Sequence, residues 1–202
     1  MAEGEREDDG TLRVTAVAVG PLDNNVYVAA CPRTGLAVVI DPGDEAGRIL
    51  EAASGLSVQA ILITHGHPDH TAAAPALQRA LATPVYLHPA DAPGAGLQAT
   101  RPLGHGDEIR FGGVALRVIH TPGHTPGSVC FFGGGCLFSG DTLFPGGPGA
   151  AEDPGGFATI MSSLRQWLFT LPDDTRVLPG HGPETTIGAE RPGLDEWERR
   201  GW

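Results

Sequence analysis

Glycine and proline interrupt this chain so often that long uninterrupted elements are excluded. They account for 30 and 18 of its 202 residues, and the apolar runs between them have the length of strands. Short apolar runs that end in turn-forming residues predict strands joined by loops. We expect strands over residues 12–19, 26–30, 36–40, 58–63, 85–87, 114–119, 128–132, 136–139 and 177–178.

Helices are predicted in the intervals between these strands. Apolar residues at helical spacing favour helices over 71–81, 157–170 and 194–200, and a further one over 44–54 with Asp44 as its N-cap. The order of strands, helix, strand and helix then repeats, which indicates two similar halves, each a sheet backed by helices. The predicted fold class is therefore α+β, a four-layer αββα sandwich.

The net charge of the chain limits the classes of molecule that it can bind. Acidic residues outnumber basic ones by 24 to 13, for a formal net charge of −11, which disfavours binding to nucleic acid.

No apolar run approaches the roughly 20 residues that span a bilayer, so we expect no membrane partner. The acidic segment 1–10 indicates a flexible tail, and nothing resembling a linker divides residues 11–202, which we interpret as a single domain. With three cysteines at no metal-binding spacing, the chain fits the cytoplasm.

The sharpest chemical signal is the segment THGHPDH at residues 64–70. Alternate residues of an extended segment point the same way, so His65 and His67 can bind one metal side by side. Asp69 and His70 follow where the chain turns into a helix, and they can serve a second position nearby. Imidazole and carboxylate ligands suit zinc, iron or manganese, and the absence of thiolates argues against a closed structural zinc site.

Three later loops offer one further ligand each. His124, Asp141 and His181 each follow a predicted strand, so one edge of the sandwich could gather them with the THGHPDH segment. His65, His67 and His124 then form a three-histidine site, and Asp69, His70 and His181 form its neighbour. Asp141 can bridge the two positions. The remaining histidines, His88, His105 and His120, fit no ligand spacing.

These motifs resemble the metallo-β-lactamase fold superfamily of metallohydrolases. The resemblance runs from about residue 14 to 190, and within the superfamily the chain is most similar to small glyoxalase II-like (hydroxyacylglutathione hydrolase-like) proteins. The stretches that carry this similarity are TPGHTPGS around His124, SGDTLF around Asp141 and LPGHGPETTIGAE around His181, with the early segment NNVY at residues 24–27. The resemblance implies the sandwich fold, the same ligand grouping and two divalent metal ions, with zinc expected first and iron or manganese as alternatives.

Residues outside the ligand set also receive roles. Asp41 ends the third predicted strand, and we expect it to anchor a ligating histidine, because such histidines commonly donate their other N–H to a carboxylate. Asn25 and Tyr27 belong to the NNVY segment and are candidates for the support or lining of the pocket. Residues 145–153 contain no cation, where glyoxalase II enzymes usually place basic residues, so the usual glutathione contacts are not expected.

The leading functional prediction is a binuclear metal-dependent hydrolase that cleaves a small-molecule thioester or ester. A hydroxide bridging the metals would be the nucleophile, because metal binding lowers the pKa of water to about 7, and Asp69 and Asp141 would be its catalytic carboxylates. The first alternative is a mononuclear non-haem iron persulfide dioxygenase that uses His65, His124 and Asp141. A second alternative is a metal-binding module without catalysis. The sequence does not indicate the oligomeric state.

Overall fold

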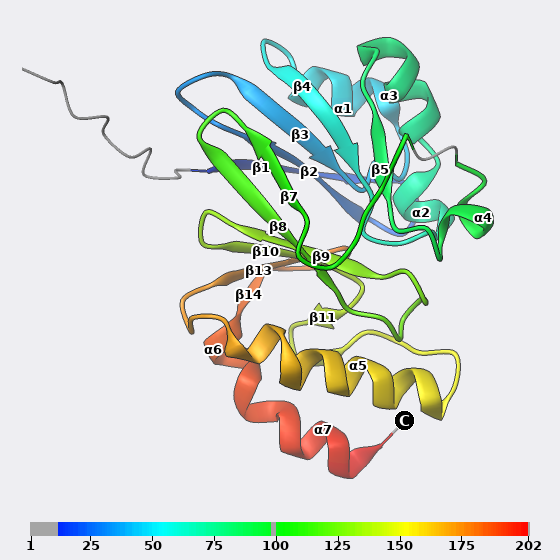
Figure 1. Cartoon of the computed structure of the whole chain (residues 1–202), viewed down its shortest axis with the longest axis vertical. Helices are drawn as coiled ribbons and strands as arrows, with labels where there is room; N and C mark the ends of the chain where they lie inside the picture. Colours follow the sequence, from blue (N-terminus) through cyan, green and yellow to red (C-terminus); the bar gives the residue numbers. More distant parts are fainter. Residues whose placement is uncertain (1–11, 98–99, 202) are drawn as a thin grey trace, which may run out of the picture.

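Two six-stranded sheets stack face to face in the computed structural model, with helices on both outer faces (Figure 1). The structure describes residues 12–97 and 100–201. The predicted flexible tail over residues 1–10 lies outside the described residues. Strands form in all nine apolar runs expected from the sequence, and most of the strand side chains are buried. The sequence did not predict the strands at residues 101–102, 108–111, 143–144, 147–148 and 185–186.

The first sheet follows the chain in order, β1-β2-β3-β4-β5-β6. Its first three strands are antiparallel neighbours, whereas β3, β4, β5 and β6 pair in parallel. The strands are β1 (Arg13–Val19), β2 (Asn24–Ala30), β3 (Leu36–Ile40), β4 (Ser57–Leu62), β5 (Val85–Leu87) and β6 (Arg101–Pro102). The helices of this half are α1 (Ala46–Ala52), α2 (Pro68–Thr71), α3 (Ala74–Leu81) and α4 (Ala92–Ala95).

The second sheet has the order β14-β13-β10-β9-β8-β7. Here β10 and β13 pair in parallel and the other neighbours are antiparallel. The strands are β7 (Glu108–Phe111), β8 (Val114–His120), β9 (Val129–Gly133), β10 (Cys136–Gly140), β13 (Arg176–Pro179) and β14 (Thr185–Thr186), and a separate hairpin joins β11 (Leu143–Phe144) and β12 (Gly147–Pro148). The helical segments are α5 (Pro154–Gln166), α6 (Ile187–Glu190) and α7 (Leu194–Arg200), with short 3-10 turns at Leu168–Thr170 and Arg191–Gly193.

Three apolar clusters hold the layers together. The central cluster lies between the sheets and includes Tyr27, Phe111, Leu116, Phe131 and Phe138. A second cluster packs α1 and α3 on the outer face of the first sheet, and a third packs α5 and α7 on the second sheet. This layering confirms the predicted αββα sandwich.

Two local predictions are wrong. The helix expected over 71–81 is interrupted, because the Ala73 N–H bonds to Pro42 O and α3 restarts at Ala74 with Pro75 in its first turn. Asp44 does not cap α1, since its carboxylate accepts from the Glu45 N–H and the N-cap position is Glu45 itself. In both places a loop contact replaces the helical bond that local propensity favours.

None of the helices in the described part of the chain is both long and apolar enough to cross a bilayer.

Candidate metal centre

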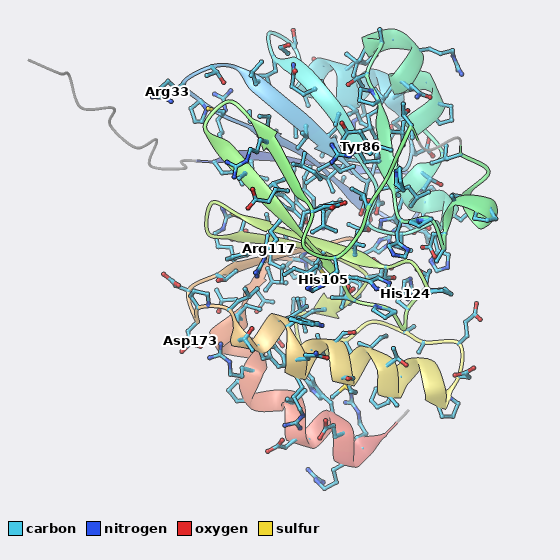
Figure 2. All side chains as sticks on the ribbon, viewed as in Figure 1. Arg33, Tyr86, His105, Arg117, His124 and Asp173 are labelled. Carbon is cyan, nitrogen blue, oxygen red and sulfur yellow. The ribbon has the colours of Figure 1, made fainter. Side chains whose placement is uncertain are left out.

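The predicted ligand residues gather where strands of both sheets end. The THGHPDH segment follows β4, and His67 precedes α2, which carries Asp69 and His70. His124, Asp141 and His181 follow β8, β10 and β13 of the second sheet. Parallel strands place their carboxyl ends at the same edge, and both sheets contain such a pair at this point. In Figure 2, His124 lies at the side of the molecule away from Arg33 and Asp173.

Three imidazole nitrogens converge in the first group. His67 Nδ1 lies 3.0 Å from His65 Nε2 and 3.0 Å from His124 Nε2. His65 is buried, whereas His67 and His124 are partly exposed. The first sheet supplies two of these side chains and the second sheet supplies the third, so the group spans the sandwich.

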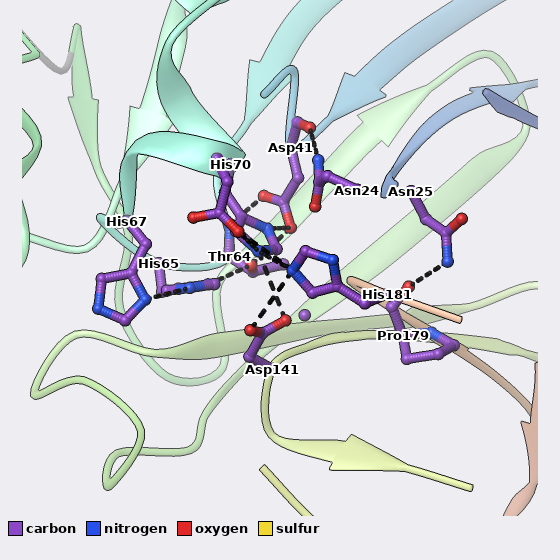
Figure 3. A network of polar contacts seen from close by, with 12 residues as sticks. Asn24, Asn25, Asp41, Thr64, His65, His67, His70, Asp141, Pro179 and His181 are labelled. Carbon is purple, nitrogen blue, oxygen red and sulfur yellow. Dashed lines mark hydrogen bonds and ion pairs between the residues drawn. The ribbon is translucent and has the colours of Figure 1, made fainter. Parts of the chain in front are cut away.

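The second group also joins the two sheets. His181 Nε2 lies 3.1 Å from Asp69 Oδ2 and 3.3 Å from His70 Nε2. Asp141 lies between the groups, with Oδ1 at 3.4 Å from His70 Nε2 (Figure 3). Its Oδ2 lies 3.6 Å from His124 Nε2. The structure therefore brings all seven predicted ligand residues to one place, in overlapping sets whose ligand atoms lie within 4.8 Å of one another.

Asp41 orients the buried histidines of both groups. Its backbone has a positive φ of 52°, and its carboxylate accepts hydrogen bonds from the Thr64 N–H at 2.7 Å, the Thr64 hydroxyl at 2.6 Å and His70 Nδ1 at 3.0 Å. Because the Thr64 hydroxyl gives its proton to Asp41, it accepts one from His65 Nδ1, 3.1 Å away. Asp41 thus determines which ring nitrogen carries the proton in His65 and in His70.

For the histidines of the second sheet, backbone carbonyls determine which ring nitrogen carries the proton. His124 Nδ1 lies 2.7 Å from Ala150 O, and His181 Nδ1 lies 3.0 Å from Leu22 O. A carbonyl oxygen only accepts, so each Nδ1 must carry the proton. In both rings the lone pair of Nε2 is therefore directed into the centre.

The pKa values follow from burial and from the carboxylates. Burial lowers the pKa of His65 well below its usual value, and the neighbouring histidines lower it further. Burial and His124 also lower the pKa of His67. For His70, burial acts in the same direction, but the hydrogen bond to Asp41 and the surrounding carboxylates outweigh it and raise the pKa. The lowered pKa values of His65 and His67 favour their neutral forms, which are the forms that bind a metal.

Asn25 and Tyr27 support the loop that carries His181. The Tyr27 hydroxyl donates to Pro179 O at 2.7 Å, and the Asn25 side chain donates to Pro179 O and Gly182 O at 3.1 and 2.8 Å. Burial, with the nearby Asp41 charge, raises the pKa of Tyr27 above its usual value, so the phenol remains a donor. Tyr27 therefore holds the backbone before His181, and Asn25 holds the backbone on both sides of it.

The donor set fits divalent cations. Five imidazoles and two carboxylates meet without a thiolate, which suits zinc, iron or manganese. Within the described residues, Asp141 Oδ1 is buried and has no hydrogen-bond partner. An orphaned carboxylate oxygen beside several imidazole lone pairs is an unfavourable arrangement unless a cation lies among them.

The other three histidines lie outside this centre. His88 and His120 stack with ring centroids 4.3 Å apart, and His105 contacts the Trp167 ring. His120 Nε2 also lies 3.0 Å from Pro126 O, which is the loop contact that a structural role requires.

Sequence reasoning missed several supporting groups. The carbonyls of Leu22 and Ala150 give no signal in the sequence, because every residue has one. Thr64 and Asp91 offered only a weak sequence signal for a role near the centre. Asp91 precedes Ala92-Pro93, a pattern that is typical of a helix N-cap, yet its side chain makes no capping bond to α4.

The family model of the metallo-beta-lactamase superfamily matches residues 19–181. The chain belongs to this superfamily. The matched range contains every residue of the metal centre described above.

Relatives in the superfamily cover most of the chain. An uncharacterized protein of Aquifex aeolicus is 39% identical over 88% of this chain and 93% of its own length. The probable metallo-hydrolase YqgX of Bacillus subtilis is 37% identical over 86% and 92%, respectively. The hydroxyacylglutathione hydrolase GloC of Haemophilus influenzae is 33% identical over 77% and 84%.

Solved structures that are similar to this chain also cover most of its length. TTHA1623 in a di-iron-bound form is 41% identical with a TM-score of 0.76, over 88% of this chain and 97% of its own. ETHE1 from Myxococcus xanthus is 31% identical with a TM-score of 0.79, over 89% and 81%. The chain is thus a metallo-β-lactamase superfamily protein of the metallo-hydrolase type, with His and Asp clusters suited to divalent metals.

Proposed function

We propose that this protein is a binuclear metal-dependent hydrolase that cleaves a thioester or ester of a small molecule. The observation that carries the proposal is the place of Asp141, whose carboxylate lies within 3.6 Å of His124 in one group and 3.4 Å of His70 in the other. A single carboxylate shared by two groups is suited to bridge two cations. Zinc is the metal that we expect first, with iron or manganese as alternatives.

The seven ligand residues would hold the two cations. His65, His67 and His124 serve one position, Asp69, His70 and His181 serve the other, and Asp141 serves both. Bound divalent ions lower the pKa of water and polarise a carbonyl group. Asp69 is the more exposed carboxylate, with 28% of its side chain accessible against 14% for Asp141, so it can orient the attacking water by accepting a hydrogen bond from it.

Two cavities flank the centre and can receive the two ends of a substrate. One, of about 230 Å³, is lined mostly by apolar atoms of Leu22, Asn24, Pro68, Asp69 and neighbouring residues. The other, of about 290 Å³, lies beside His124 and includes Glu152 and Asp153. The described residues that line these cavities include no arginine. This supports an apolar acyl group and a thiol or alcohol that is not strongly anionic.

The test is to measure metal content and turnover on the same purified protein. We expect two metals per chain and hydrolysis within a panel of neutral thioesters, esters and lactones. His124→Ala should remove one metal and most of the activity. His88→Ala, which changes a histidine outside the centre, should leave both nearly unchanged. Retention of two metals and full turnover by His124→Ala would refute the assignment.

The second candidate is an iron-dependent persulfide dioxygenase. It is favoured by the similarity to ETHE1 and by the convergence of His65, His124 and Asp141, which provide two imidazoles and one carboxylate. One iron per chain, with oxygen uptake on glutathione persulfide and no hydrolysis of the panel, would replace the hydrolase. Full metal occupancy with no turnover in either assay would support a metal-binding module without catalysis.

A further inference from the structure

Asp91 joins two loops that supply metal ligands, although it lies in neither of them. It follows β5 and is buried, with 6% of its surface exposed. Its Oδ2 accepts the Gly66 N–H at 2.8 Å and the Thr125 hydroxyl at 2.6 Å, and its Oδ1 accepts the Gly127 N–H at 2.7 Å. Gly66 stands between His65 and His67, and Thr125 directly follows His124.

The backbone around Asp91 is shaped to admit its carboxylate. A Cβ atom on Gly127 would lie 2.6 Å from the Asp91 carboxyl carbon, and a Cβ on Gly66 would lie 3.1 Å from Asp91 Cβ. The Thr125 hydroxyl, besides donating to Asp91, lies 2.8 Å from Ser128 Oγ. Side chains at these two glycines would therefore separate the loops that Asp91 joins.

This contact reaches only one half of the centre. The loops that Asp91 ties together carry the three histidines of the first group. The second group has other supports, namely the bonds of His70 to Asp41 and of His181 to Leu22 O. Asp91 is therefore bonded only to residues beside ligands of the first position, whereas Asp41 supports a buried histidine of each position.

We propose that Asp91 is a positioning residue for the three-histidine metal position, which sets the distance between the His65–His67 segment and the His124 loop. The proposal rests on the ligand assignment made under the proposed function. Loss of Asp91 leaves two backbone donors without their acceptor and frees the loops to separate, so the affinity for one metal should fall. The second position should keep its affinity.

The experiment measures the two stepwise dissociation constants for zinc, by competition with a chromophoric chelator, in the wild type and in variants. We expect Asp91→Ala to weaken one constant by about 10–100-fold, the range found for losses around metal ligands, and to change the other less than about twofold. Asp91→Asn should be intermediate, because its one acceptor oxygen can still bind Gly66 and Thr125. Asp107→Ala is the matched control, since Asp107 accepts a single backbone bond from Gly104 in a turn outside the centre.

Equal weakening of both constants, or none, would overturn the proposal. The unfolding temperature of the metal-free protein is measured for each variant, so that a general loss of structure is recognised. If Asp91→Ala does not fold, Thr125→Val removes one bond of the same contact, and it should weaken the same constant in part. These measurements use no substrate, so the proposal can fail while the hydrolase stands, and the reverse also holds.

Discussion

Asp41→Asn should impair both metal positions, although Asp41 is expected to touch no metal. The substitution preserves shape but replaces one acceptor oxygen by an NH₂ donor. The Thr64 N–H is fixed and points at Asp41 Oδ1, so the amide oxygen must remain there. The NH₂ group then faces the Thr64 hydroxyl and His70 Nδ1, which bind Oδ2 in the wild type.

The Thr64 hydroxyl and His70 Nδ1 can both reverse the direction of their hydrogen bonds, and this reversal changes the tautomers of the ligating histidines. The Thr64 hydroxyl would accept from the amide and donate to His65 Nδ1, and His70 Nδ1 would become an acceptor. The remaining proton on each ring would then reside on Nε2, the atom directed into the centre. A ligating nitrogen must be unprotonated, so metal binding would have to reverse both tautomers.

The size of the effect follows from the bonds that must be broken. Hydrogen bonds to charged groups contribute about 1.5–3 kcal/mol each, and one such bond is lost at each metal position. This corresponds to a loss of about 10–100-fold in affinity at each position, because about 1.4 kcal/mol is a factor of ten. Stepwise zinc dissociation constants measure it, with Asp107→Asn as the control for the same chemical change elsewhere. Wild-type affinity at both positions, or a loss confined to one, would refute the tautomer argument.

Two further predictions concern stability. Gly140→Ala should lower the free energy of unfolding by about 2–4 kcal/mol, because φ at Gly140 is +48° and a Cβ there would lie 2.3 Å from Thr64 Oγ1. Gly135 also has a positive φ, of +72°, but a Cβ there would meet no atom within 4 Å. Gly135→Ala should therefore lower the free energy of unfolding by only about 1 kcal/mol. Denaturant titration of both variants checks this, and equal losses would contradict it. Burial raises the pKa of Cys130 from 9.0 to about 11, so the thiol of the unfolded chain ionises first. Between pH 9 and 11 the wild type should therefore lose about 2 kcal/mol of unfolding free energy relative to Cys130→Ala. Parallel pH profiles of the two proteins would contradict this.

The sequence was sufficient to predict the sandwich and the candidate ligands, because these depend on strong local signals. The apolar runs that form β3, β4 and β10 end at Asp41, the THGHPDH segment and Asp141, and few residues other than His and Asp offer such ligands. The supporting contacts were harder to predict. Asp91 bonds to residues 25, 34 and 36 positions away along the chain, and no local pattern encodes such distances.

The misplaced helix boundary has the same physical origin. Residues 71–81 are rich in alanine and favour a helix, but the Ala73 N–H bonds to Pro42 O in the loop after β3. Local propensity is worth only tenths of a kcal/mol per residue, so a single long-range hydrogen bond can outweigh it. The resulting break separates α2, which carries Asp69 and His70, from α3, which packs on the sheet.

Glycine explains how short side chains from two sheets can share one centre. A Cβ on Gly180 would lie 2.3 Å from Asp141 Oδ1 and 2.5 Å from His70 Cε1, and Gly140 is equally close to Thr64. At this edge the two sheets therefore come close together because the glycines carry no side chain. This close approach allows a carboxylate as short as Asp141 to reach ligands of both groups. Cations that bridge these groups would bind across the contact between the sheets, so their binding and the docking of the sheets should stabilise each other.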